Sequence, residues 1–406
     1  MSHIPELSIG VVGHVDHGKT TLVQALTGQW TARHSEELKR SMTIKLGYAD
    51  GYLVKCEGLE APQAYRTDTI CPKGLKQEIL KTVSYVDAPG HEILMATMLS
   101  GASLMDAALL VIATNEPCPQ PQTREHLMAL DIMGIDQLIV VQNKVDVVDR
   151  EQAKRNYQQI VEFLSTTRYS KAPIIPISAL HRVNIDILIM AMVKLFKTPE
   201  RDLSKPAYML VARSFDVNLP GTAPDKLVGG IIGGGLTKGE LKVGDEIEIK
   251  PGVRVMEKGS TRYVPLTTKV VSIRYGTKES NRAIPGGLVA VGTMLDPSLT
   301  KADTLVGNVA GHYVPDPVDS LHIEYKLFER AVGSRFQEVV EPIKPRETLL
   351  LTVGTAVRLS TATKVTKDEV EVVLREPVVV IPRINVAISR QIKGRWRLIG
   401  WGRIKM

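Results

Sequence analysis

The amino-acid sequence predicts an α/β domain with a mostly parallel sheet and helices on both faces, followed by two all-β barrel domains. From Leu7 to about Phe196, apolar runs alternate with amphipathic helical stretches, which is typical of a parallel sheet covered by helices. Beyond that point, short β-like runs broken by glycine favour barrels. Charge divides in the same way, because residues 1–200 carry a net charge of −2 and residues 201–406 a net charge of +9.

The α/β domain is expected to carry its ligand at the carboxyl ends of its strands, as open α/β sheets do. Strands are expected near residues 8, 84, 110, 140 and 175, and helices over 20–27, 91–100, 122–133, 150–165 and 184–196. A polar linker over 198–202 follows. The barrels are expected to include strands over 242–249, 349–353, 369–373, 378–381 and 397–399. We therefore expect domains at 1–202, 203–320 and 321–406.

Composition places the chain among globular proteins, with 44% hydrophobic and 23% charged residues. It contains no apolar stretch long enough to span a membrane, and the first residues do not resemble a secretory signal. Three cysteines in 406 residues predict no disulfide framework and favour a reducing, cytoplasmic location.

Residues 13–20 read Gly-His-Val-Asp-His-Gly-Lys-Thr and stand between an apolar run and a helix-like stretch. This is the pattern of a phosphate-binding loop, in which glycines let the backbone approach a polyphosphate and the helix N-terminus faces the anion. Lys19 is expected to contact the outer phosphates, and the Thr20 hydroxyl to bind Mg²⁺. The alternative is an ordinary strand-to-helix turn.

The choice of base is predicted by Asn143-Lys144-Val145-Asp146, which ends an apolar strand. The Asp146 carboxylate can accept hydrogen bonds from N1–H and the 2-amino group of guanine, which adenine does not offer. Sites of this kind discriminate by about 10⁴-fold. Asn143 and Lys144 would brace the loops and cover the ring. Ser178-Ala179-Leu180 follows a further apolar stretch and would donate a backbone N–H to guanine O6.

Two further segments are expected to sense the third phosphate. Asp87-Ala88-Pro89-Gly90 ends a strand, so Asp87 would hold Mg²⁺ through water while the Gly90 N–H meets the γ-phosphate. Thr43 is the candidate for the second switch, with its hydroxyl on the metal. The alternative for Thr43 is a solvated loop residue.

Two residues are candidates for catalysis. His91 directly follows Gly90 and would orient or polarise the attacking water, unless it is a helix cap. Asp16 is a second candidate, because the phosphate-binding loop places it near the metal. The predicted chemistry is hydrolysis of GTP to GDP.

The end of the chain is basic. No acid follows Glu376, and a basic surface with aromatic residues suits a phosphate backbone. The alternative is a strand whose polar residues face water. The basic residues are Arg383, Arg390, Lys393, Arg395, Arg397, Arg403 and Lys405, interleaved with Trp396 and Trp401.

These motifs together resemble the translational GTPases, and within them the family of γ subunits of archaeal and eukaryotic initiation factor 2. Residues 13–21 and 87–91 are shared by the whole class of translational GTPases. Narrower resemblance comes from segments 34–40, 115–123, 213–218 and 387–391.

The resemblance implies a GTP-dependent carrier of initiator methionyl-tRNA to the small ribosomal subunit, working as a heterotrimer. The α subunit would dock on the second domain and the β subunit on the nucleotide domain. Tyr48 would help to form the aminoacyl pocket, and a second Mg²⁺ would lie near Asp16 and Ser41, although the family usually has glycine at Ser41. The residues implied to contact GTP are Asp16, His17, Gly18, Lys19, Thr20, Thr21, Asn143, Lys144, Val145, Asp146, Ser178, Ala179 and Leu180.

The sequence departs from the family between Gly51 and Lys81, where archaeal members often carry two Cys-x-x-Cys pairs that bind zinc. Here Cys56 and Cys71 remain, while Leu59 and Gly74 occupy the second positions. Two thiolates fall short of the four ligands of a structural zinc. We therefore expect Cys56 and Cys71 to be free thiols on a loop held by packing.

Two other functions remain open from the sequence. A selenocysteine-specific elongation factor shares the layout but typically adds a further C-terminal domain, which we do not expect here. A non-hydrolysing, GTP-bound scaffold on the ribosome is the other possibility, and the expected role of His91 weighs against it.

Overall fold

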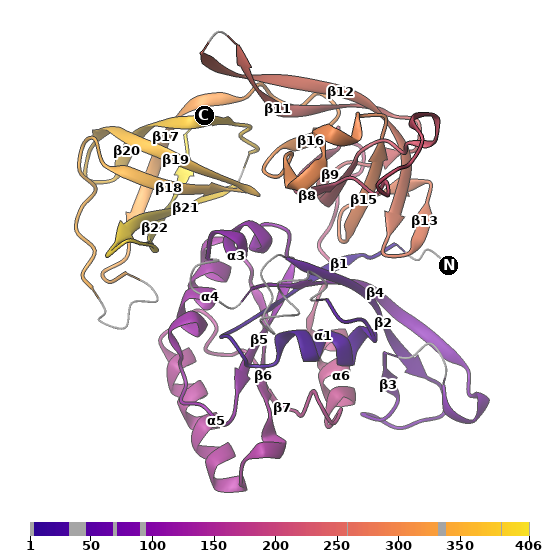
Figure 1. Ribbon diagram of the computed structural model, residues 1–406. Coiled ribbons are helices and arrows are strands. Elements are labelled where there is room, and N and C mark those ends of the chain that lie inside the picture. The colour runs from indigo at the N-terminus through magenta and orange to yellow at the C-terminus, as the bar shows by residue number, and fades with distance from the viewer. Residues whose placement is uncertain are drawn as a thin grey trace. The chain divides into compact units, whose positions relative to one another are not determined.

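The computed structural model describes residues 4–31, 46–67, 71–89, 95–257, 259–331, 338–382 and 384–405. It divides into two compact units. The first contains Pro5–Pro199, and the second contains Ile4 and the β-rich segments Glu200–Ala331 and from Glu338 onward. The predicted fold class, an α/β domain followed by two all-β barrels, is confirmed (Figure 1).

The first unit is built on a seven-stranded sheet in the order β3-β2-β4-β1-β5-β6-β7. Neighbours from β4 to β7 run parallel, whereas β2 pairs antiparallel with both β3 and β4. The antiparallel β2–β3 extension was not predicted, because the glycines in β2 lower its resemblance to a strand. The strands are β1 (Leu7–Val12), β2 (Gly47–Cys56), β3 (Tyr65–Arg66), β4 (Gln77–Asp87), β5 (Ala107–Ala113), β6 (Gln137–Asn143) and β7 (Ile174–Pro176).

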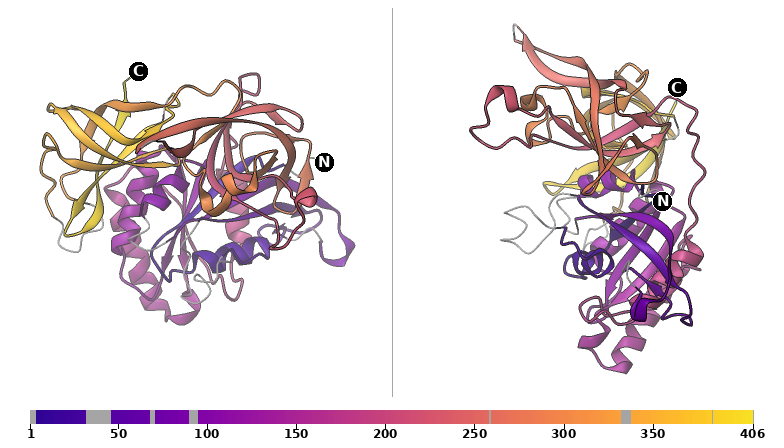
Figure 2. Two further views of the ribbon diagram at one scale, coloured as in Figure 1. Left: turned by 45° about the horizontal axis from the view of Figure 1, so that its top comes forward. Right: turned by 90° about the vertical axis from the view of Figure 1, so that its right-hand side faces the viewer.

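Five α-helices are described in this unit, and they cover both faces of the sheet (Figure 1 and Figure 2). They are α1 (Lys19–Thr27), α3 (Met95–Ala102), α4 (Pro121–Ile132), α5 (Arg150–Ser165) and α6 (Ile185–Leu195). The longest begins at an N-cap, where the Asp149 side chain accepts a hydrogen bond from the Gln152 N–H. Such a cap satisfies one of the N–H groups that a helix start leaves unpaired. Residues 91–94 of the helix predicted over 91–100 lie outside the described residues.

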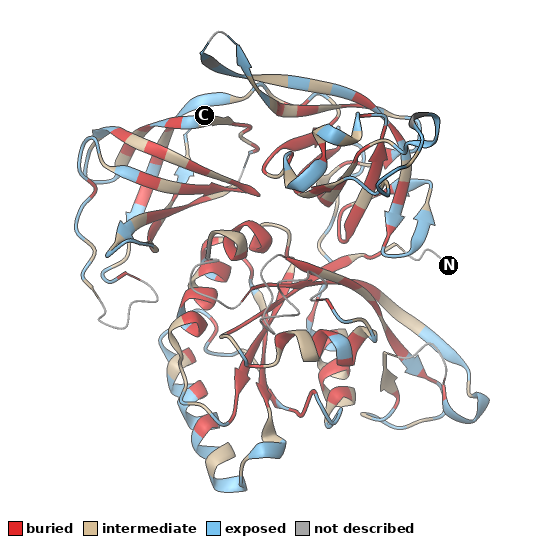
Figure 3. Ribbon diagram, in the orientation of Figure 1, coloured by how far each residue is buried: buried red, intermediate tan, exposed pale blue. Residues whose placement is uncertain are grey.

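The core of the first unit sits against the central strands. Every residue of β1 is buried, as expected for a parallel strand covered on both faces. Leu7, Ile9 and Val11 belong to one cluster with Leu22 and Leu26 of α1. Buried residues accordingly concentrate in the middle of the sheet (Figure 3). This packing holds β1 and α1 in place, so both ends of the loop between them are anchored to the core.

The first barrel closes through six strands in the order β11-β16-β8-β9-β15-β12, because β12 also pairs with β11. Its apolar core includes Met209, Ile232 and Val291. The sequence predicted one strand over 242–249, but the structure has a short β10 and a long β11 there. The strands of this region are β8 (Tyr208–Phe215), β9 (Ile231–Lys238), β10 (Leu241–Lys242), β11 (Glu246–Glu257), β12 (Ser260–Tyr275), β13 (Lys278–Ser280), β14 (Arg282–Ala283), β15 (Leu288–Thr293) and β16 (Val309–Gly311).

The second barrel is a closed ring in the order β17-β20-β19-β18-β21-β22. The predicted strands over 349–353, 369–373 and 397–399 are confirmed. A separate strand over 378–381 is wrong, because β20 continues through to Val378. The ring consists of β17 (Val318–Leu327), β18 (Thr348–Val353), β19 (Ala356–Val365), β20 (Glu369–Val378), β21 (Asn385–Ile392) and β22 (Arg395–Ile404).

Within the described part of the chain, none of the helices combines the length and apolarity that crossing a membrane requires.

Candidate functional site

The predicted phosphate-binding loop joins β1 to α1 at the carboxyl edge of the sheet. Gly13 and Gly18 both have positive φ, at 141° and 90°. A Cβ atom on Gly13 would lie 2.2 Å from the Val111 carbonyl oxygen, and one on Gly18 would lie 2.4 Å from Asn143 Nδ2. Backbone this close to its neighbours requires glycine. The two glycines of the motif are therefore needed for the loop itself.

Lys19 lies at the start of α1 with its ammonium group inside the loop. Its Nζ donates a hydrogen bond to the His14 carbonyl oxygen at 2.7 Å, and the residue is 6% exposed. Burial lowers the pKa of Lys19 to about 8, although Asp87 and Asp16 oppose that change. A cation that has lost its hydration in this way gains by meeting an anion. The position suits the predicted contact with phosphate.

Thr20 and Asp87, which the sequence assigned to the metal, lie together. The Thr20 hydroxyl donates to Asp87 Oδ2 at 2.8 Å, and the Thr31 hydroxyl donates to the same oxygen at 2.6 Å. Parallel pairing of β1 with β4 sets Asp87 opposite Val11, directly before the phosphate-binding loop. Hydroxyl and carboxylate oxygens are the hard ligands that Mg²⁺ prefers, so this pair fits the ion. Thr31 is a contact that the sequence did not predict.

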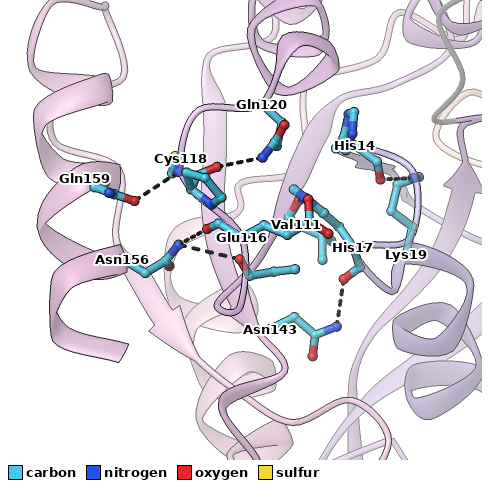
Figure 4. A network of polar contacts seen from close by, with 12 residues as sticks. His14, His17, Lys19, Val111, Glu116, Cys118, Gln120, Asn143, Asn156 and Gln159 are labelled. Carbon is cyan, nitrogen blue, oxygen red and sulfur yellow. Dashed lines mark hydrogen bonds and ion pairs between the residues drawn. The ribbon is translucent and has the colours of Figure 1, made fainter. Parts of the chain in front are cut away.

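The predicted base-recognition loop is tied to the phosphate-binding loop by Asn143 (Figure 4). Its amide Nδ2 donates to the His17 carbonyl oxygen at 2.9 Å, while its Oδ1 accepts from the Ala179 N–H at 3.0 Å. The side chain is 2% exposed, so both bonds are shielded from water. One buried amide thus joins three predicted segments.

Asp146 lies beside the third predicted segment. A hydrogen bond from Ser178 lowers the pKa of Asp146, and His181 adds a weaker favourable charge. The His181 Nε2 atom lies 3.7 Å from Asp146 Oδ2. The Asp146 carboxylate is therefore ionised near neutral pH, as an acceptor for guanine must be. Two other residues predicted to contact the base lie nearby in the sequence. Leu180 is 71% exposed, and Lys144 has a positive φ of 64°.

A histidine cluster surrounds the phosphate-binding loop. The rings of His14 and His17 lie 5.2 Å apart, and burial lowers the pKa of each to about 4. His17 Nδ1 lies 3.1 Å from the Val111 carbonyl oxygen and its Nε2 lies 3.4 Å from Glu116 Oε2. Because His17 is neutral at physiological pH, its contact with Glu116 is not an ion pair. The neutral ring carries a single N–H, so it donates a hydrogen bond to only one of these two acceptors at a time.

Behind this cluster, Asn156 of α5 holds the segment that follows β5. Its Nδ2 donates to the Glu116 carbonyl oxygen at 2.9 Å, and its Oδ1 accepts from Gln142 Nε2 at 3.0 Å. The Cys118 N–H donates to Gln159 Oε1 at 3.0 Å (Figure 4). No sequence pattern predicts this role for Asn156, since a polar residue on an exposed helix usually faces water.

Several predicted site residues lie outside the described residues, namely Ser41, Thr43, Gly90 and His91. Their assigned contacts with the third phosphate, the metal and the attacking water stay predictions. Tyr48 lies on β2 opposite Val86 and is partly buried.

The expectation of free thiols at Cys56 and Cys71 is wrong, as is the expectation that the chain forms no disulfide. The two residues form a disulfide with their Cα atoms 5.7 Å apart. Cys56 ends β2, and the chain returns after β3 so that Cys71 meets it, with exposures of 0% and 4%. Among the cysteines only Cys118 is free. The loop is cross-linked, and not held by packing alone.

Three of the seven basic residues near the end of the chain pair with acids. Arg390 forms a two-pronged pair with Glu347, and Lys405 pairs with Glu369. Lys393 pairs with Glu338. The acids come from earlier strands and loops, which the local sequence pattern does not show. Arg390, Lys393 and Lys405 therefore face acidic partners within their own barrel.

Two segments of the chain match described protein families. Residues 5–198 match the family described as the elongation factor Tu GTP binding domain, and residues 319–404 match the one described as initiation factor eIF2 gamma, C terminal. The first of these indicates that the α/β unit binds GTP or GDP.

Named relatives cover nearly the whole chain. It is 58% identical over 407 residues to translation initiation factor 2 subunit gamma of Aeropyrum pernix, covering 99% of this chain and 98% of that protein. The subunit of the same name from Pyrococcus horikoshii is 56% identical over 403 residues, covering 98% and 97%.

A solved structure of a bacterial selenocysteine-specific elongation factor, EF-Sec, has a TM-score of 0.75 at 22% identity, covering 98% of this chain and 58% of that chain. At that identity the likeness shows a shared fold only. The much higher identity of the initiation-factor relatives decides against the selenocysteine alternative. The chain therefore belongs to the family of γ subunits of translation initiation factor 2, and it is a translational GTPase of initiation.

Proposed function

We propose that this protein delivers initiator methionyl-tRNA to the small ribosomal subunit in a GTP-dependent manner. It would act in the cytoplasm as the GTPase subunit of a heterotrimer with α and β subunits. Support comes from the near full-length identity to relatives named translation initiation factor 2 subunit gamma. The three predicted domains, 1–202, 203–320 and 321–406, would divide this work between nucleotide binding and tRNA binding.

The nucleotide site of this proposal consists of the segments that Asn143 joins. Lys19 would neutralise the outer phosphates, and Asp146 would accept from guanine N1–H and the 2-amino group. The buried Asn143 side chain, bonded to both His17 and Ala179, is the observation that carries this assignment. A fixed spacing between phosphate and base contacts selects one nucleotide length and one base. The remaining proposed contacts are Asp16, Gly18, Thr21, Val145, Ser178 and Leu180.

Mg²⁺ fits the oxygen pair of Thr20 and Asp87, which lie 2.8 Å apart. When bound, the ion would neutralise developing charge on the phosphates. Thr43 would add a ligand to it, and Asp16 and Ser41 would hold a second ion. His91 would orient the attacking water.

Delivery of initiator tRNA is tested by measuring the affinity of initiator and elongator aminoacyl-tRNAs for the protein with a non-hydrolysable GTP analogue. We expect preference for the initiator form, lost when GDP replaces the analogue. Equal affinity for both tRNAs would place the protein with elongation factors. Purification from the native source should recover the α and β subunits with initiator tRNA.

Hydrolysis is tested separately, because unassisted GTPases of this mechanism are slow, at about 10⁻⁴ to 10⁻² per second. The rate should be measured with ribosomes for the native chain and for His91→Ala. A large loss in the variant supports the proposed role of His91. No turnover in either would favour a GTP-bound scaffold, and equal turnover in both would remove His91 from the mechanism.

A further inference from the structure

A buried histidine on α4 bonds directly to the phosphate-binding loop. The Gly13 N–H donates to His126 Nδ1 at 2.8 Å, across 113 residues of sequence. His126 is 1% exposed. No sequence motif singles out this residue, and nothing in the nucleotide chemistry described above uses it.

The bond sets the protonation of the ring. A histidine nitrogen that accepts from an amide carries no proton, so the proton of neutral His126 must lie on Nε2. The surroundings favour the neutral ring, because burial and the nearby Lys19, His14 and His17 all lower the pKa of His126 well below its usual value. Nδ1 is therefore a permanent acceptor across the physiological range.

Gly13 is the residue at which the chain leaves β1 and turns into the loop. Its φ of 141° and the 2.2 Å approach of a Cβ to the Val111 carbonyl oxygen leave no room for adjustment by a larger residue. The far part of the loop is held separately, through the bond from Asn143 to the His17 carbonyl. His126 thus holds the first turn of the loop, and Asn143 holds the last.

Helix α4 connects this contact to other elements. It packs against β5 and against α3, and α3 begins at Met95. Without the His126 acceptor, the Gly13 N–H would be a buried donor with a lost partner. Leaving a buried donor unpaired changes the equilibrium constant for forming this loop conformation by about tenfold or more.

We propose that His126 is a positioning residue for the nucleotide, whose Nδ1 holds the Gly13 N–H and thereby sets the loop for the phosphates. This rests on binding of GTP or GDP at this loop. The ring does not touch the nucleotide; it acts through the loop backbone, and so it should control how fast the nucleotide leaves.

Three substitutions distinguish the effect of the hydrogen-bond acceptor from the effect of the volume of the ring. His126→Asn places an amide oxygen where Nδ1 lies and keeps an acceptor for Gly13. His126→Leu fills similar space with no acceptor, and His126→Gln moves the polar group to the Nε2 end. Leu127→Ala, at a 4% exposed position on the same helix, is the matched control for packing.

The readout is release of a fluorescent GDP analogue from the full chain, followed by stopped flow, alongside the melting temperature. We expect His126→Leu and His126→Gln to release GDP at least about tenfold faster, and His126→Asn to stay within about threefold of the native rate. Leu127→Ala should lower the melting temperature with little effect on release. Equal acceleration in the Asn and Leu variants, or native release from a folded Leu variant, overturns the proposal.

A measurement on the native chain keeps the test independent of folding in the variants. In ¹⁵N-histidine-labelled protein, His126 should show the Nε2–H form with a bare Nδ1, both with and without GDP. A proton on Nδ1 would refute the bond. If the native chain bound no guanine nucleotide at all, the proposed function itself would fail. That outcome is distinct from a change in the release rate of a variant, which tests only the role of His126.

Discussion

Asn143 Nδ2 lies 2.9 Å from the His17 carbonyl oxygen and donates a hydrogen bond to it, so the proposed base-recognition loop and the phosphate-binding loop are joined within one buried side chain. The two segments are far apart in sequence, and each ends a different parallel strand. The edge of the sheet brings them together, and the amide fixes the distance between them.

Asn143→Ala should weaken GDP binding by about 100-fold. The change leaves the His17 carbonyl and the Ala179 N–H without their partner, and each buried loss costs about 1–3 kcal/mol. Isothermal calorimetry measures the affinity directly. Gln137→Ala, at the opposite end of β6, is the control and should bind GDP as the native chain does. Unchanged affinity in Asn143→Ala would mean that the joint is dispensable.

Asp146→Asn should exchange guanine for xanthine. The amide N–H of asparagine can donate to the xanthine 2-carbonyl, whereas the carboxylate accepts from the guanine 2-amino group. We expect GDP affinity to fall by about 10³-fold or more and XDP affinity to rise. Asp149→Asn is the control, because asparagine also caps helices well. A variant that still prefers GDP would exclude Asp146 from base recognition.

The Cys56–Cys71 disulfide should stabilise the first unit by about 3 kcal/mol, as the loop-entropy relation gives for a sequence separation of 15. Cys71→Ser should therefore lower the melting temperature, whereas Cys118→Ser should change it little. Alkylation of the denatured chain gives a second check. One thiol should react without reductant and all three with it; three reactive thiols from the outset would contradict the bond.

His126 should make the protein less stable in acid. Its pKa in the folded chain lies well below 6.5, so below about pH 6.5 the unfolded chain binds a proton that the folded chain excludes. Stability should fall as pH drops, by up to about 1.4 kcal/mol per unit for this residue. The charges of Lys19, His14 and His17 lower the pKa of His126 further, and His14 and His17, whose own pKa values are lowered to about 4, add to the loss of stability in acid. Urea unfolding at pH 7 and pH 5 should show a smaller loss for His126→Asn than for the native chain.

Arg390 and Glu347 should be strongly coupled in the second barrel. Their side chains are 16% and 17% exposed, and Arg390 also donates to the Glu341 carbonyl at 2.8 Å. Arg390→Leu should cost about 3–5 kcal/mol, since it leaves a mostly buried carboxylate without its cationic partner. Replacing both residues by leucine should recover part of that loss. A double-mutant cycle followed by chemical unfolding measures the coupling, and additive effects would show none.

The parts of the fold that followed from sequence are those in which one local pattern decides the structure. The phosphate-binding loop was predicted because its glycines, Lys19 and Thr20 lie within a few residues between a strand and a helix. Asn143 and Asp146 followed because they end an apolar strand. In each case the sheet, once formed, brings the strand ends to one edge.

The parts that did not follow depend on distant partners. His126 bonds a residue 113 positions earlier, and nothing in its neighbourhood distinguishes it from an ordinary core histidine. Glu347 and Glu369 pair with Arg390 and Lys405, which lie further along the chain, and a count of local charge misses these pairs. The disulfide was missed because the pairing requires the chain to double back between β2 and η1 (Pro72–Gly74), a path set by loop geometry.

Strand β22 pairs with β17 on one side and β21 on the other, and it follows every other strand of its ring in sequence. During synthesis on the ribosome, the backbone N–H and C=O groups along one edge of β17 and one edge of β21 therefore lack their partners until β22 has emerged. Exposed strand edges are sites of aggregation. Nascent chains stalled before β22 should consequently need chaperone protection, whereas the closed ring has no exposed strand edge and should not.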